Sequence, residues 1–225
     1  MAVERKVVRA SSLVQLGVNS VSRRIFLPLS LVVAVQFSSV CIAQQVSAQR
    51  ICVASNPARA SVHDPEVDFL IALAKRESGG DQTCVNYAGY LGLFQMGGRA
   101  LADAGFYKLG PSPDENAWDG VFSERARFAD VVSTDTYLSH AGAQELAVRA
   151  YHNVQWNRIT RLGLSSKVGS VIAGVTLTKS GMIAGSHLVG IGGLMIFVRT
   201  NGQQIPIDGS GTPITEYLSL FGSFY

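Results

Sequence analysis

The chain has 225 residues, 47% of them hydrophobic and 16% charged, a composition that excludes an intrinsically disordered protein, a collagen-like repeat and a coiled-coil rod. Of the 19 basic and 16 acidic residues, the first 48 positions hold five and one, which leaves a nearly neutral body with 14 and 15. Because nucleic-acid binding relies on Lys and Arg that neutralise phosphates, no nucleic-acid partner is expected.

An export signal is predicted over residues 1–48, ahead of a single domain over residues 49–225. The segment Ser22-Arg23-Arg24-Ile25-Phe26-Leu27 resembles a twin-arginine signal, and the apolar run after it ends in small residues. Cleavage is expected after Ala48, with Ala43 as the other candidate. An ordinary secretory signal is the alternative interpretation. Both signals lead out of the cytoplasm, so a periplasmic or secreted bacterial protein is expected.

The three cysteines agree with export. Cleavage after Ala48 removes Cys41 and leaves an even number in an oxidising compartment, so a disulfide between Cys52 and Cys84 is predicted. It would close a loop of roughly 30 residues and stabilise the fold by about 3 kcal/mol in the chain-entropy model. Two unpaired thiols are the alternative. A lipid anchor on Cys41 is disfavoured by the residues before it, and no histidine signature accompanies a catalytic cysteine.

The first helix of the mature chain is the best marked. Asp64 is a favourable N-cap, and Pro65 suits the first helical position because an N–H there would have no partner. Gly79-Gly80 ends the helix. Glu77 lies in the last turn, at the edge of an apolar stripe that is expected to face the core. The stripe consists of Val67, Leu70, Ile71 and Ala74.

Helical periodicity continues to the C-terminus, so the predicted fold is mostly α, with almost no strand pattern. Further helices are expected at about 97–105, 123–138 and 142–160, followed by a pair at about 177–200 and a short one near 213–222. The Gly-Pro-Ser-Pro-Asp sequence at 110–114 is predicted to be the loop between the first two of these.

Residues 180–198 carry no charge, so a membrane-spanning helix has to be weighed. Five glycines interrupt the run, and Gly190-Ile191-Gly192-Gly193 indicates a break between two short buried helices, so no membrane span is expected after signal removal. Gly181 and Gly185 would allow close helix packing. His187 is predicted to be a core histidine that donates to a backbone carbonyl. No metal or other cofactor is expected, because metal-ligand spacing is lacking at the remaining histidines, His63, His140 and His152.

The segment from Glu77 to Met96 carries the candidate chemistry. The negative end of the helix dipole and partial burial both disfavour ionisation, so the pKa of Glu77 is expected to be raised toward that of a general acid. Gly89 and Gly92 allow close backbone approach, and Gln95 offers a donor and an acceptor. The alternative is that Glu77 only finishes a helix and that the nearby aromatic residues are core. Sugar rings could lie on the aromatic faces of Tyr87, Tyr90 and Phe94.

Glu-Ser-Gly-Gly at 77–80, then Asn86 and Gly-Leu-Phe-Gln-Met at 92–96, resemble the active-site signature of soluble lytic transglycosylases and their lysozyme-like relatives. Ala150-Tyr151-His152-Asn153 is similar to an Ala-Tyr-Asn element of that family, although the residue after the tyrosine differs and the following glycine is missing. The resemblance covers about residues 64–160. It implies a lysozyme-like helical domain, here with additional C-terminal helices.

The resemblance gives Glu77 the role of sole catalytic acid and base. The implied partner is the glycan strand of peptidoglycan, cleaved at the β-1,4 bond between N-acetylmuramic acid and N-acetylglucosamine to leave a 1,6-anhydro end. The substrate's own 6-hydroxyl is the nucleophile, so neither a second carboxylate nor a cofactor is needed. Substrate contacts are implied for Ser78, Asn86, Tyr90, Gln95, Met96 and Tyr151, with Asn86 standing where the family often has serine.

Two other functions stay open at this point. A lysozyme-like muramidase, which is a hydrolase, would need a second carboxylate, and Asp81, Asp103 and Asp119 are available. The position nine after the acid, where many phage lysozymes carry an aspartate, is Asn86, which favours the transglycosylase. A non-catalytic cell-wall-binding module would keep the aromatic residues without the acid chemistry.

Overall fold

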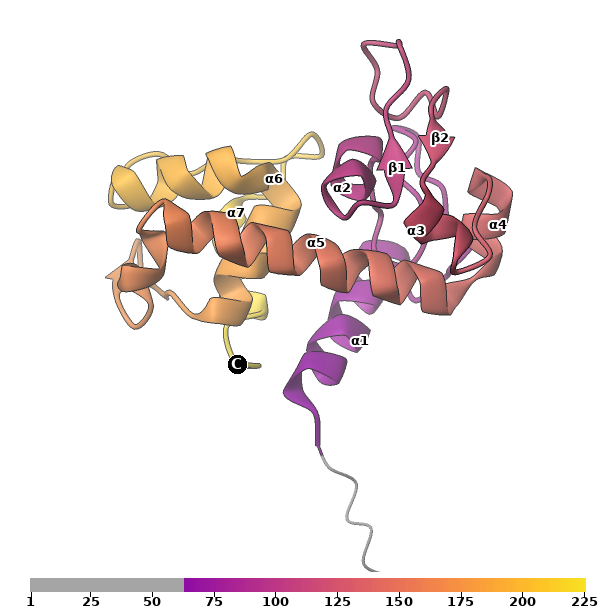
Figure 1. Ribbon diagram of the computed structural model, residues 1–225. Coiled ribbons are helices and arrows are strands. Elements are labelled where there is room, and N and C mark those ends of the chain that lie inside the picture. The colour runs from indigo at the N-terminus through magenta and orange to yellow at the C-terminus, as the bar shows by residue number, and fades with distance from the viewer. Residues whose placement is uncertain (1–62) are drawn as a thin grey trace, which may run out of the picture. The chain divides into compact units, whose positions relative to one another are not determined.

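The computed structural model describes residues 63–225 (Figure 1). Its secondary structure is mostly α-helical, as the periodicity predicts. The predicted export signal, both candidate cleavage sites and Cys52 lie outside the described residues, so the signal and the Cys52–Cys84 disulfide remain predictions.

The helices account for nearly all of the regular structure in the described part of the chain. They are α1 (Pro65–Ser78), α2 (Gly98–Asp103), α3 (Glu124–Arg127), α4 (Thr134–Ser139), α5 (Ala141–Arg161), α6 (Lys179–Arg199) and α7 (Ile214–Leu220), with one 3₁₀ turn, η1 (Leu164–Lys167). Two small antiparallel hairpins pair β1 (Tyr107–Lys108) with β2 (Val121–Phe122), and β3 (Val171–Ile172) with β4 (Val175–Thr176).

Helix α1 begins and ends where the sequence predicts. The Asp64 carboxylate accepts a hydrogen bond from the backbone N–H of Glu66 at 2.9 Å, and Gly79 takes the left-handed conformation that closes the C-terminus. The predicted buried stripe is partly wrong, because Val67 and Ile71 are exposed. The helix is turned so that its largest side chain is enclosed, and the buried face consists of Phe69, Leu70, Leu73 and Ala74.

The single helix expected at 123–138 is two short helices, α3 and α4. The backbone of Asp130 is left-handed, with φ 58°, and the N–H of buried Val131 donates to the carbonyl of Ala126, which ends α3. A new helix then begins at Ser133, whose hydroxyl and that of Thr136 form a reciprocal capping box. The burial of Val131 and the capping box at Ser133 together break the segment into two helices, although its periodicity favours one.

Helix α5 is the long central element of the described part (Figure 1). Its N-terminal half packs into one group of buried residues with α1, α2 and α4, and its C-terminal residue Ile159 packs into a second group with α6 and α7. Phe69 of α1 contributes aromatic edge contacts to the first group, with rings 5.5 to 5.8 Å away. These rings belong to His152, Phe221, Phe224 and Tyr225.

Helix α6 is interrupted at Gly190, with φ 70° and ψ 171°, so the predicted break between two helical segments is confirmed. The close helix packing predicted around Gly181 is also present, because a Cβ there would lie 2.7 Å from the carbonyl oxygen of Leu218 in α7. By length and composition alone, α6 is apolar enough to cross a membrane, and half of its most apolar window is buried against the rest of the described chain.

Candidate functional site

Glu77 lies on the buried face of α1, in the last helical turn. It follows Leu73 by four residues and Ala74 by three, so the helical repeat places it in the same row as the core positions. Only 14% of its side chain is exposed. The Glu77 carboxyl group therefore lies at the C-terminal end of the apolar face of α1, as the sequence predicts.

Tyr217 of α7 is the principal partner of this carboxyl group. Its phenol donates a hydrogen bond to Glu77 Oε1 at 2.8 Å. Burial, followed by the neighbouring Glu77, raises the pKa of Tyr217, so the phenol keeps its proton and remains a donor. The neighbouring residues also join α1 to α7. Arg76 forms an ion pair with Glu216, and its guanidinium lies 5.5 Å from the centre of the Tyr217 ring.

His187 of α6 approaches the same carboxylate oxygen. Its Nε2 lies 3.9 Å from Glu77 Oε1 and 2.9 Å from the carbonyl oxygen of Phe94. The predicted donation by His187 to a backbone carbonyl is confirmed, since a carbonyl oxygen can only accept. What sequence reasoning missed is that this histidine borders Glu77.

Two residues of α5 complete the surroundings of His187. His152 Nε2 lies 3.2 Å from His187 Nδ1, and the Tyr151 ring meets the His187 ring edge-on at 5.8 Å. Both α5 side chains are buried. Burial, reinforced by His187 and Arg149, holds the pKa of His152 well below its usual range, so this imidazole is neutral near pH 7.

The motif segment after α1 is held to the helix end by its own polar side chains. The Ser78 hydroxyl donates to the carbonyl of Leu93 at 3.0 Å. The side-chain oxygen of Asn86, Oδ1, accepts from the N–H groups of Ala88 at 2.9 Å and Tyr90 at 3.1 Å, which closes a turn. Gln95 has φ 45°, and its amide donates to the carbonyl of Gly92 at 2.9 Å. Through these hydrogen bonds, the three side chains shape the loop.

The aromatic residues and Met96 divide between core and surface. Met96 is 1% exposed and Phe94 is also buried, so both pack in the core and offer no free face to a sugar. Tyr87 is 90% exposed, and Tyr90 is partly buried beside Gly97. Of the candidate sugar platforms in this segment, Tyr87 and Tyr90 are therefore the accessible ones.

Gln144 of α5 ties the motif segment to the rest of the fold, and sequence reasoning did not single it out. Its carbonyl oxygen accepts from the N–H of Leu93 at 2.7 Å, and its amide nitrogen donates to the carbonyls of Tyr137 at 2.9 Å and Gln82 at 3.0 Å. Gly92 has φ 75°, and a Cβ there would lie 2.2 Å from the Gln144 carbonyl oxygen. Glycine is thus required for this close approach.

The three aspartates considered as second acids are each engaged elsewhere. Asp103 forms a two-pronged ion pair with Arg158, and Asp119 accepts from the N–H of Ser112 at 2.9 Å. Asp81 accepts from the hydroxyl and the N–H of Thr83, which lower the pKa of Asp81. Among the described residues, none of these three carboxylates forms a hydrogen bond or ion pair with Glu77, Tyr217 or His187.

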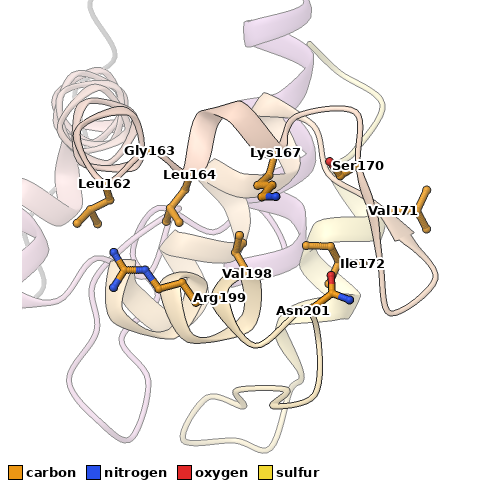
Figure 2. A pocket seen from close by; sticks show the side chains of 10 residues that line it. All are labelled: Leu162, Gly163, Leu164, Lys167, Ser170, Val171, Ile172, Val198, Arg199 and Asn201. Carbon is orange, nitrogen blue, oxygen red and sulfur yellow. The ribbon is translucent and has the colours of Figure 1, made fainter.

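A pocket of about 480 Å³ lies away from Glu77, between the C-terminal ends of α5 and α6, η1 and β3 (Figure 2). Lys167 and Arg199 lie on its wall at the ends of η1 and α6. Cations in such positions interact favourably with the negative ends of helices, which accounts for them without a bound anion. No residue discussed above for the Glu77 site lines this pocket.

Within residues 63–225, no group of three or more His, Cys, Asp or Glu side chains is arranged to hold a metal ion. Cys84, the described half of the predicted disulfide, is partly buried.

Tyr217→Phe should destabilise the protein by about 1–2 kcal/mol, because a partly buried carboxylate loses its donor while the ring and its packing stay. Urea unfolding of the variant against the wild type measures this. Tyr90→Phe is the matched control, since the Tyr90 hydroxyl makes no hydrogen bond to a described residue, and it should change the free energy of unfolding little. Equal stability of the Tyr217 variant and the wild type would show that the hydrogen bond is not made in solution.

Comparison of the chain with protein-family models, curated proteins and solved structures finds no significant match.

Proposed function

We propose that the protein is a peptidoglycan-cleaving lytic transglycosylase with a lysozyme-like helical domain and Glu77 as its single acid and base. The observation that carries the proposal is the environment of Glu77: a shielded carboxyl group at a helix end, fixed by Tyr217, with no second carboxylate among its described partners. The motif loop that resembles this family is bonded to the same helix end through Ser78.

The chemistry follows from one carboxyl group used twice. Tyr217 donates to Oε1 of Glu77, which leaves Oε2 as the oxygen that carries the catalytic proton. Protonated Glu77 donates to the glycosidic oxygen as that bond breaks and positive charge develops on the muramic sugar. The resulting carboxylate takes the proton from the 6-hydroxyl of the same sugar while its oxygen bonds to the anomeric carbon. The product is a 1,6-anhydro end, and the acid is regenerated.

The substrate class agrees with the expected location. A glycan strand of the bacterial wall lies outside the cytoplasm, where the predicted export signal would deliver the protein. The exposed Tyr87 and the partly buried Tyr90 supply aromatic faces for sugar rings beside the motif loop. Tyr151, which the resemblance assigns to substrate contact, instead lies buried against His187, so we assign it a role in shaping the acid's surroundings.

The muramidase alternative requires a water molecule activated or an intermediate stabilised by a second carboxylate. Asp103, Asp119 and Asp81 would each have to give up existing partners to serve in that role. The wall-binding alternative predicts affinity for peptidoglycan without turnover. The muramidase would leave reducing ends and the wall-binding module would release no fragments, so the released products separate all three functions.

Digestion of purified peptidoglycan in heavy-oxygen water tests the proposal. A transglycosylase incorporates no solvent oxygen, because the nucleophile belongs to the substrate, whereas a hydrolase labels each new reducing end. We expect unlabelled ends in the wild type, and unchanged release by Asp119→Asn and Asp81→Asn. Labelled reducing ends that disappear in an aspartate variant would establish the muramidase instead, and sedimentation with the wall without release would establish the binding module.

A further inference from the structure

The contacts of Glu77 extend inward to a second titratable group. We propose that His187 is a positioning residue that controls the charge of Glu77, with neutral His152 behind it as the acceptor for its second ring proton. The role in catalysis rests on the proposed function, but the coupling between the two charges does not.

The hydrogen bonds of His187 can be satisfied in both of its charge states. The Phe94 carbonyl fixes a hydrogen on Nε2, at 2.9 Å. In the neutral ring, Nδ1 accepts from His152 Nε2, and in the charged ring Nδ1 donates to it, over the same 3.2 Å. His152 needs only to exchange its tautomer. The His187 ring can therefore gain a proton here without leaving either of its own N–H groups unpaired, which is the usual obstacle to burying a charge.

The surroundings place the charge on His187 in preference to His152. Glu77 Oε1 lies 3.9 Å from His187 Nε2, and an opposite charge at that distance favours the charged ring. Within residues 63–225, His152 has no carboxylate partner, and burial together with His187 and Arg149 keeps it neutral. Of the two imidazoles, His187 is therefore the one that faces a carboxylate.

Among the described residues that face His187, Glu77 supplies the one carboxyl group. From α5 come neutral His152 and Tyr151, and burial raises the pKa of Tyr151 so that it stays protonated. From α7, Tyr217 reaches His187 only through Glu77. The motif segment presents the uncharged carbonyl of Phe94.

The consequence for catalysis is a reciprocal coupling. A positive His187 stabilises the Glu77 carboxylate, which is the form left after proton donation and the form that acts as base. The same charge makes Glu77 give up its proton at lower pH than it would beside a neutral residue. Because the coupling between two sites is mutual, each group must shift the titration of the other by the same amount.

Histidine NMR measures the coupling without any activity. The imidazole signals are followed against pH in the wild type, in Glu77→Gln and in the control Glu145→Gln, and are assigned with His187→Gln and His152→Gln. We expect the titration midpoint of His187 to fall by about one pH unit in Glu77→Gln and to stay in place in the control. The midpoint of exposed His140 should not move in either variant. An unmoved His187 midpoint, or a His187 that never titrates, would overturn the proposal.

The activity profile supplies the second readout. His187→Gln retains a donor for the Phe94 carbonyl but cannot become charged, so the alkaline loss of cleavage should move to higher pH by about one unit. A histidine with a purely structural role would lower the rate equally at every pH, and that result would contradict the proposal. If the wild type cleaves no peptidoglycan, the proposed function fails, yet the NMR titration still decides whether Glu77 and His187 are coupled.

Discussion

Glu77→Gln is expected to lower the rate of peptidoglycan cleavage by about a thousand-fold, within the range that a general acid and base contributes. The amide has nearly the shape of the carboxyl group, and its carbonyl oxygen can still accept from Tyr217, but it has no acidic proton to give and cannot take one back. The measurement is the release of soluble fragments from purified peptidoglycan over time, with the variant and the wild type at equal concentration.

Glu145→Gln provides the matched control, because Glu145 is an exposed residue of α5 that pairs with Arg149 at the surface. It should keep the wild-type rate. Thermal unfolding of Glu77→Gln should show a midpoint close to that of the wild type, which separates lost chemistry from lost structure. Retention of more than about a tenth of the rate by a folded Glu77→Gln would place the catalytic acid elsewhere.

Gln144→Ala is expected to destabilise the protein by about 3 kcal/mol or more. The substitution leaves the N–H of Leu93 and the carbonyl of Gln82 without this partner, and the carbonyl of Tyr137 keeps only the N–H of His140. Each unsatisfied buried group costs about 1–3 kcal/mol. Because Leu93 belongs to the motif segment, cleavage should also fall as the loop loosens. Urea unfolding gives the free energy, and the fragment-release assay gives the rate.

Gln155→Ala isolates the hydrogen bonds from the loss of volume. Gln155 is buried on the same helix, and its side-chain carbonyl oxygen has no hydrogen-bond partner in the described part of the chain. Both variants remove the same atoms, so the difference between them reports the bonds of Gln144, and we expect about 2 kcal/mol. Equal destabilisation by the two substitutions would mean that Gln144 contributes only packing.

The sequence predicts those parts of the fold that local chemistry determines. The start of α1 follows from Asp64 and Pro65, and its end follows from Gly79. Each of these residues affects only the backbone close to it in the sequence. The break in α6 at Gly190 is likewise a local property of the backbone. The face that α1 buries is different, because it depends on which partner elements enclose Phe69, and periodicity alone favoured the neighbouring face.

The site divides in the same way. Glu77, Ser78 and Gln95 were identified because they share one short motif. The residues that contact the Glu77 carboxyl group come from the C-terminal third of the chain. No sequence pattern points to Tyr217 as a site residue, and His187 stands out only as a lone histidine in an apolar run. Their approach is set by the packing of α6 and α7 against α1, which no spacing in the sequence encodes.

Mass spectrometry of the glycan fragments released by the wild type and by Glu77→Gln decides whether Glu77 is the acid and base of a transglycosylase. We predict 1,6-anhydro ends, one water lighter than reducing ends, in the wild-type digest and no such fragments from the variant. Reducing ends in the wild-type digest, or anhydro ends that persist at the wild-type level in Glu77→Gln, would contradict it.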